Sequence, residues 1–163
     1  MRKILLVIIT LFSLNAVAES LEVDRVRASI LILTKKPNMK PRILHKILDG
    51  AVRAAKKYKV PLNVVLAIAW VESSYNINAT NKRSNDYGIM QVNEWHIKRS
   101  KLDKIKLLTD YYYSFEQGVK IFKWFYDKYP LDEAIMRYNC GTKKSCIKWT
   151  KVQKYLDKVR RAW

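Results

Sequence analysis

The feature that most constrains this chain is the run of residues 63–71, which is apolar at every position after Asn63. Pro61 stands just before the run, and proline favours the first turn of a helix. A helix that is apolar on all sides has to be buried on most of them. We therefore expect this helix at the centre of a globular domain. Its last side chains lead directly into a single carboxylate, Glu72.

Glu72 is a candidate general acid because it stands where the apolar run stops. A carboxyl there would border a hydrophobic wall on one side and open solvent on the other. Loss of water on the apolar side raises a carboxyl pKa, which suits a general acid that works near neutral pH. A buried helix would also hold the group rigidly, as proton transfer requires. An ordinary solvated glutamate in a last helical turn would show the same local pattern.

The surrounding sequence predicts a mainly α fold in a single domain. A chain of 163 residues is of one-domain length. Apolar residues recur at helical spacing in several segments, whereas residues 75–87 are polar and indicate a loop or a small hairpin. The predicted helices other than the apolar one span residues 41–58, 114–129, 131–138 and 146–163. In the helix of residues 114–129, Ser114 is expected to be the N-cap and Gln117 its reciprocal partner.

Three short motifs follow one another along the chain. They are Glu72-Ser73, the GIMQ of residues 88–91, and the RYNCG of residues 137–141. They resemble the three signatures of the SLT-type lytic transglycosylases, which usually read ES, GLMQ and AYNAG. These lysozyme-like enzymes cleave bacterial peptidoglycan. Each motif is weak alone, but three in this order at the family's usual separations are specific, and the resemblance covers roughly residues 41–141.

The resemblance implies a lysozyme-like fold, α+β with a small hairpin or loop region, and a reaction. The bond between N-acetylmuramic acid and N-acetylglucosamine is cleaved, a 1,6-anhydromuramic acid end forms, and Glu72 is the sole acid and base. Ser73 would orient Glu72, Tyr138 would hydrogen-bond its carboxylate, and Asn139 would hold a sugar substituent. The candidate substrate-binding residues are Ser73, Tyr75, Met90, Gln91, Asn93, Tyr138 and Asn139.

This sequence departs from the family pattern at three places. Ile89 stands where leucine is usual, and Arg137 and Cys140 replace the two alanines that flank Tyr-Asn. Arg137 adds a charge that either lies near the pocket or points to solvent. No departure removes a residue with chemistry of its own.

Two other functions remain open from the sequence. Glycosidases usually use two carboxylates, so a lysozyme-type hydrolase would need a partner for Glu72, and Asp86 is the candidate. A non-catalytic protein could instead use its charge to bind wall polymers, a membrane surface or nucleic acid. Metalloprotease, phosphate-loop and nucleophile-elbow motifs are absent from the sequence, and we expect neither a cofactor nor a metal.

The net charge of +18 favours an anionic partner or neighbourhood. A lysine-rich genome would give the same excess, so charge alone does not name the partner. Residues 1–18 have the form of a secretory signal peptide, with Arg2 and Lys3, an apolar run, and Ala16-Val17-Ala18 as the cleavage pattern. An uncleaved N-terminal anchor is the alternative. We expect a periplasmic or secreted protein with no stable membrane span after removal of the signal.

The remaining organisation follows from these segments. Residues 19–40 form an N-terminal extension without an assigned structure, and residues 41–163 form the lytic transglycosylase domain. The Asp-x-Gly-x-Met-Gln-x-Asn segment, residues 86–93, is similar to small family members of secretion, conjugation or pilus systems. The expected partners are therefore peptidoglycan strands and such a complex, with no nucleic acid, and the protein is expected to be a monomer.

The two cysteines, Cys140 and Cys146, are six positions apart. In an exported protein such a pair favours a disulfide that closes a small loop. His45 and His96 have no ligand spacing to either cysteine, so a metal site is not indicated.

Overall fold

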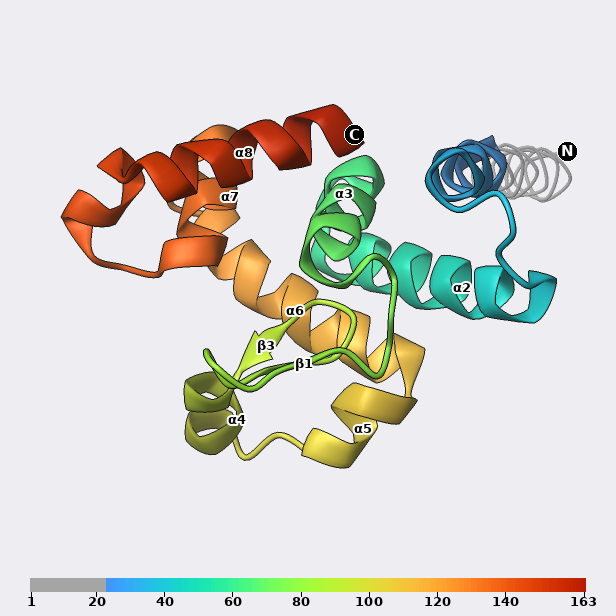
Figure 1. The fold of residues 1–163 in the computed structure, drawn as a ribbon, viewed down its shortest axis with the longest axis horizontal. Coiled ribbons are helices and arrows are strands. Elements are labelled where there is room, and N and C mark those ends of the chain that lie inside the picture. The colour runs from blue at the N-terminus through green and yellow to red at the C-terminus, as the bar shows by residue number, and fades with distance from the viewer. Residues whose placement is uncertain (1–22) are drawn as a thin grey trace, which may run out of the picture. The chain divides into compact units, whose positions relative to one another are not determined.

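The computed structural model describes residues 23–163, and the predicted signal peptide lies outside this range. The chain divides into two compact units, residues 1–39 and Lys40–Trp163. In the first unit, residues 23–35 are helical, within the segment to which the sequence assigned no structure. Within the described range, no helix is long and apolar enough to cross a membrane. The second unit contains all three motifs (Figure 1).

Helix α2, Pro41–Tyr58, begins at its predicted proline and ends before Lys59, which has a left-handed φ of 52°. Its apolar face packs against helix α6, Tyr111–Tyr126. The two helices approach closely at Gly50, because a Cβ there would lie 2.9 Å from the ring of Phe115. This contact fixes the position of α6.

Helix α3, Leu62–Ser73, contains the apolar run. The side chains of residues 64–69 are at most 1% exposed, which confirms that this helix is buried. It contacts α2 and also helix α8, Thr150–Ala162 (Figure 1). Burial of each Val, Leu or Ile side chain contributes about 1.5–3 kcal/mol, so the helix that carries Glu72 is one of the most firmly held in the unit.

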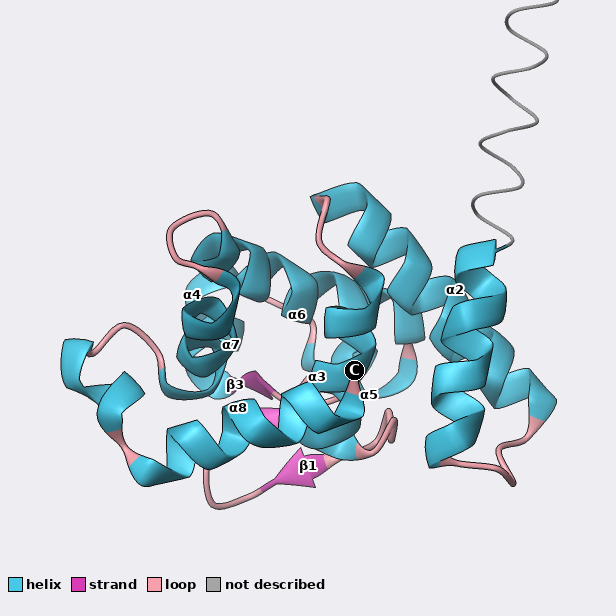
Figure 2. Cartoon of the chain, turned by 90° about the horizontal axis from the view of Figure 1, so that it is seen from above, coloured by secondary structure: helices cyan, strands magenta, loops and turns pink. Residues whose placement is uncertain are grey.

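The polar segment that follows α3 forms a small three-stranded sheet. Strands β1, Thr80–Asn81, β2, Asp86–Tyr87, and β3, Val92–Asn93, are antiparallel in the order β1-β2-β3. Tyr87 lies opposite Thr80 on one side and Val92 on the other. Figure 2 shows how small the strands are beside the helices. The architecture is therefore mainly α with a small hairpin region, as predicted.

Two short helices complete this side of the unit. They are α4, Glu94–Ser100, and α5, Lys104–Thr109. A small hydrophobic cluster joins the sheet to both of them, with Tyr87, Val92, Ile97 and Leu107 at its centre. The cluster gives the sheet a core of its own, which strands of two residues could not supply by themselves.

Helix α6 begins earlier than the sequence predicted. Its N-cap is Asp110, whose carboxylate accepts a hydrogen bond from the Tyr113 N–H at 3.0 Å. The prediction that Ser114 caps the helix was therefore wrong. Ser114 is completely buried, and its Oγ accepts a hydrogen bond from the Ile89 N–H at 3.1 Å. The serine links α6 to the second motif instead.

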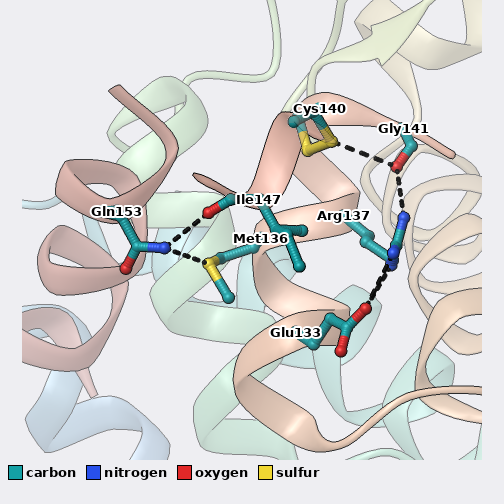
Figure 3. Close-up of a disulfide and its surroundings, with 8 residues drawn as sticks. Glu133, Met136, Arg137, Cys140, Gly141, Ile147 and Gln153 are labelled. Atoms are coloured by element: carbon teal, nitrogen blue, oxygen red, sulfur yellow. Dashed lines mark hydrogen bonds and ion pairs between the residues drawn. A yellow bond between two sulfur atoms is a disulfide. The ribbon is translucent and has the colours of Figure 1, made fainter. Parts of the chain in front are cut away.

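The C-terminal part consists of α7, Leu131–Cys140, the 3-10 helix η1, Lys144–Lys148, and α8. The predicted last helix, residues 146–163, is thus divided between η1 and α8. A disulfide joins Cys140 to Cys146, with an S–S distance of 2.03 Å, which confirms the predicted pair. It ties the end of α7 to η1 (Figure 3).

Candidate functional site

A cleft of about 770 Å³ passes over the end of α3. Its lining comes from α3, from the sheet and α4, from α6, and from the end of α7 with the loop that follows. Among residues 23–163, Glu72 and Asp86 are the only carboxylates that line it. Among the described residues, no group of three or more His, Cys, Asp or Glu side chains could hold a metal ion.

Glu72 lies one residue before the end of α3 and is partly buried in the cleft. Its Oε1 accepts a hydrogen bond from the Tyr155 hydroxyl at 2.6 Å. The pKa of the Glu72 carboxyl is raised from 4.5 to about 7, mainly because the group is buried. The Tyr155 hydrogen bond opposes this rise by favouring the charged form, and the nearby charge of Asp86 adds to it. Near neutral pH the group can therefore give up a proton and take one back.

Tyr155 is a site residue that the sequence interpretation missed. It lies on the buried face of α8, at the helical spacing of Val152, Leu156 and Val159, and there it looks like an ordinary core residue. The packing of α8 against α3 brings its hydroxyl to Glu72. No local pattern could have shown this contact, because 83 positions separate the two residues.

Tyr138 was expected to hydrogen-bond the Glu72 carboxylate. In the structure its hydroxyl donates to the Met90 carbonyl oxygen at 2.6 Å. The negative charge of Glu72 is close enough to add to the effect of burial in raising the pKa of the Tyr138 phenol. Tyr138 thus lies beside the carboxyl in the cleft but holds the second motif, and Tyr155 provides the hydrogen bond to Glu72.

Ser73 was expected to orient Glu72 directly. Its Oγ lies 2.8 Å from the Ile89 carbonyl oxygen and 3.1 Å from that of Ala69. The contact to Ile89 joins the end of α3 to the second motif. Ser73 therefore acts on the geometry around Glu72 through the backbone rather than through the carboxylate itself.

The second motif, residues 88–91, forms a tight turn in which the Gln91 N–H donates to the Gly88 carbonyl oxygen at 3.1 Å. Gly88 has a φ of 82°, and a Cβ there would lie 2.4 Å from the Leu107 carbonyl oxygen, so a larger residue does not fit. Gln91 has a φ of 48° and lines the cleft. Its Nε2 donates to the carbonyl oxygens of Gly88 at 2.8 Å and Ala79 at 3.1 Å. The amide therefore stabilises the turn, and its Oε1 has no hydrogen bond within the described chain.

Met90 and Tyr75 are buried residues that do not line the cleft. Met90 packs against α6 at Gly118, where a Cβ would lie 2.3 Å from the Met90 Cβ. Tyr75 lies with its ring centre 5.5 Å from that of Trp70, and its hydroxyl has no hydrogen-bond partner within the described chain. Met90 therefore anchors the second motif to α6, and Tyr75 packs against Trp70 of α3.

Asn93 and Asn139 both line the cleft. The Asn93 Nδ2 donates to the Asp86 Oδ1 at 2.6 Å and to the Ser84 carbonyl oxygen at 2.8 Å, while its Oδ1 caps α4. The Asn93 amide is therefore occupied in fixing Asp86. Asn139 is exposed, and it presents an amide at the end of α7 where a ligand could reach it.

Arg137 lines the cleft, which confirms the first of the two alternatives considered for its charge, although the side chain is mostly buried. Its Nε donates to Glu133 at 2.8 Å and its Nη1 to the Gly141 carbonyl oxygen at 3.4 Å (Figure 3). The guanidinium also lies 4.1 Å from the Tyr129 ring centre. Together with the disulfide at Cys140, these contacts hold the loop that follows Asn139.

Helices α4 and α6 contribute further cleft residues that the motifs do not include. Trp95 and Arg99 come from α4, and Gln117, Lys120 and Trp124 come from α6. Those on α6 recur three or four positions apart, which puts them on one helix face. The tryptophans are conspicuous because they stay exposed, Trp95 at 57% and Trp124 at 47%. Exposed aromatic rings in a cleft are suitable surfaces for apolar sugar faces.

Comparison with known proteins gives one family and two similar relatives. The model of the family described as "Transglycosylase SLT domain" matches residues 51–160. Protein IpgF of Shigella flexneri and protein IpgF of Shigella sonnei are each 34% identical to this chain over 97 residues. The match covers 55% of this chain and 64% of each relative, so the chain spans slightly less than two thirds of the length of these relatives.

Proposed function

Since this chain belongs to the transglycosylase SLT domain family, we propose that it is a peptidoglycan lytic transglycosylase with Glu72 as its only acid and base. Family membership also confirms the lysozyme-like fold that the motifs implied. The bond that is cleaved joins N-acetylmuramic acid to N-acetylglucosamine, and the product carries a 1,6-anhydromuramic acid end. The observation that carries this proposal is a carboxyl of pKa about 7 on a rigid helix at the cleft.

The first step is protonation of the bridging oxygen. Glu72 donates its proton as the bond from the anomeric carbon to that oxygen breaks, and the leaving sugar departs as an alcohol. Positive charge develops at the anomeric carbon and its ring oxygen. The Glu72 carboxylate formed at the same moment is stabilised by the Tyr155 hydroxyl, 2.6 Å from Oε1, because hydrogen bonds to a charged acceptor are the stronger ones.

The second step uses the same group as a base. The Glu72 carboxylate takes the proton from the sugar's own 6-hydroxyl, and that oxygen forms a bond to the anomeric carbon. A ring closes, no water is consumed, and Glu72 regains the proton that it gave up. A pKa near the working pH favours both transfers.

The other candidate residues would bind the glycan or hold the residues that do. Asn139 has a free amide on the cleft, and Gln91 has a free Oε1, so these two are proposed to contact acetamido and hydroxyl groups. Ser73, Met90 and Tyr138 hold the second motif through the contacts described above. Trp95 offers an exposed ring on which a sugar can stack.

A lysozyme-type hydrolysis is the second candidate, because Asp86 lines the same cleft and its charge reaches Glu72. In that reaction Asp86 would activate a water molecule or stabilise the cationic sugar opposite the acid. The Asn93 amide holds the Asp86 Oδ1, which fixes the carboxylate in place for such a role. The products distinguish the two reactions.

The test is a digest of purified peptidoglycan followed by mass analysis of the fragments. Transglycosylation gives fragments lighter than the hydrolysis products by one water molecule, with no new reducing ends. Glu72→Gln should abolish both kinds of product while the protein stays folded. Asp157→Asn, which removes an exposed carboxylate from α8, is the matched control and should leave the activity unchanged.

Three outcomes would change the assignment. Reducing-end products that Asp86→Asn abolishes would establish the hydrolase. Release of fragments by Glu72→Gln near the native rate would refute the role of Glu72. Tight binding to the wall without any product would favour a binding protein.

The proposed setting is the periplasm or the outside of the cell, with local opening of the wall for a secretion, conjugation or pilus complex. It is supported by the signal-like residues 1–18 and by the motif segment 86–93. Fractionation of cells that express the full chain, with and without residues 1–18, tests the location.

A further inference from the structure

Three arginine or lysine side chains from the described part of the chain line the cleft. Arg137 is paired with Glu133, and the other two cations come from different helices. Arg99 lies on α4, one turn after Trp95, and Lys120 lies on α6, one turn after Gln117. All four side chains line the cleft, and both cations are exposed. The reaction of Glu72 uses neither cation. Their placement on the cleft face of two separate helices therefore needs another explanation (Figure 1 shows α4 and α6).

Neither cation is neutralised by the protein. Among the described residues, no carboxylate forms an ion pair with Arg99 or Lys120, although Glu94 on α4 pairs with Lys104 at 3.1 Å. The Arg99 guanidinium lies 5.1 Å from the Trp95 ring centre, a contact that positions the group but leaves its charge uncompensated. Both side chains can therefore bind an anion that enters the cleft.

The two acids of the cleft, Glu72 and Asp86, do not neutralise Arg99 and Lys120 either. Because the pKa of Glu72 is about 7, this carboxyl is largely uncharged below neutral pH. One oxygen of Asp86 accepts a hydrogen bond from the Asn93 amide. A substrate that brings its own carboxylates would meet two cations and at most two acids, one of them protonated over part of the working range. Complementary charges between a protein and its ligand contribute more to specificity than to overall affinity.

We propose that Arg99 and Lys120 bind the carboxylates of the peptides attached to the glycan, so that the cleft selects strands that carry acidic peptides. The inference rests on the proposed function, because it takes peptidoglycan as the substrate. The sugars of that polymer bind through hydroxyl and acetamido groups, whereas its peptides extend from the muramic acid lactyl group and carry carboxylates. These two cations, which line the same cleft as Glu72 and Asn139, match that arrangement.

The experiment measures binding by the Glu72→Gln variant, which separates selection from turnover. The ligands are soluble glycan oligomers with peptides whose carboxylates are free, and the same oligomers with those carboxylates converted to amides. Size and sugar content are equal in the two ligands, so only charge differs. We expect binding of the free carboxylate form to be roughly fivefold tighter at low salt, and the difference to shrink as ionic strength rises.

Variants that remove positive charge show which residues cause the preference for free carboxylates. In the Glu72→Gln background, the double substitution Arg99→Gln and Lys120→Gln should abolish this preference. The matched control, Arg42→Gln and Lys56→Gln on α2, removes the same number of charges outside the cleft and should leave the preference unchanged. The proposal would be overturned if the protein bound both ligands equally or bound neither. It would also be overturned if the two double variants lost the preference for free carboxylates to the same extent.

Turnover by the native protein distinguishes failure of the proposed peptide selection from failure of the proposed lytic reaction. Cleavage without any preference for free carboxylates would leave the lytic reaction intact and refute the role of Arg99 and Lys120. A preference that depends on these two residues, without any cleavage, would support the selection and refute the reaction.

Discussion

Glutamine in place of Glu72 should stabilise the folded protein at pH 8 and leave its stability at pH 4 almost unchanged. Burial raises the pKa of this carboxyl from its ordinary 4.5 to about 7. Between these two values the folded protein keeps a proton on Glu72 that the unfolded chain releases. Stability therefore falls as the pH rises through that window and stays at the lower level above it.

The size of the effect follows from the pKa. A rise from 4.5 to about 7 corresponds to about 3 kcal/mol, at about 1.4 kcal/mol for each tenfold change in acidity. One side of the carboxyl faces the cleft, where water screens the charge, so we expect about 1–3 kcal/mol. Glutamine has nearly the same shape, and its Oε1 can still accept the hydrogen bond from Tyr155. The substitution thus removes the buried charge with little loss of packing.

Urea unfolding at pH 4 and pH 8, followed by the fluorescence of the five tryptophans, measures the difference. With a slope of about 2 kcal/mol per molar urea, the midpoint of Glu72→Gln should rise by roughly 0.5–1.5 M at pH 8. Asp157→Asn reports the effect of removing a surface carboxylate. The reasoning is refuted if native protein and Glu72→Gln change in parallel between the two pH values, or if the variant is less stable at pH 8.

Three further substitutions test the contacts around the cleft. Tyr155→Phe removes the hydrogen bond that favours the charged form of Glu72, so the carboxyl pKa should rise and the alkaline fall of kcat/KM should move up by about one pH unit; a shift to lower pH would contradict this. Replacing Cys140 and Cys146 with serine opens a short loop and should lower the free energy of unfolding by about 2 kcal/mol, and equal urea midpoints for the two proteins would show that the disulfide contributes nothing. Gly118→Ala places a Cβ 2.3 Å from a buried methionine and should cost about 1–3 kcal/mol, which thermal unfolding would disprove by an unchanged Tm.

The sequence predicted the central helix and the position of its carboxylate because both depend on a local pattern. Residues 64–71 are all apolar, so only burial accommodates them, and Glu72 is the first charged residue after them. The disulfide was predictable for a similar reason, since the chain has only two cysteines and they are six positions apart. The mainly α class followed from helical spacing alone.

The hydrogen bonds at the site were harder to predict because they depend on packing between distant segments. Tyr138 and Tyr155 are both buried phenols near Glu72, and only the packing of α8 against α3 decides which one reaches the carboxylate. Ser114 and Asp110 are both good N-cap residues, and the sequence does not show that the serine is needed by Ile89. The burial of Met90 likewise depends on Gly118, a glycine whose role becomes visible only when α6 lies against the motif.

The distance along the chain between Glu72 and Tyr155 gives the protein a built-in order of events. The acid is made early in synthesis, but its phenol belongs to α8, the last helix that the structure describes. A chain whose α8 is still inside the ribosome has the Glu72 carboxyl without the hydroxyl that stabilises its negative charge. The carboxyl and this hydroxyl therefore come together only after α8 has been made and has packed against α3.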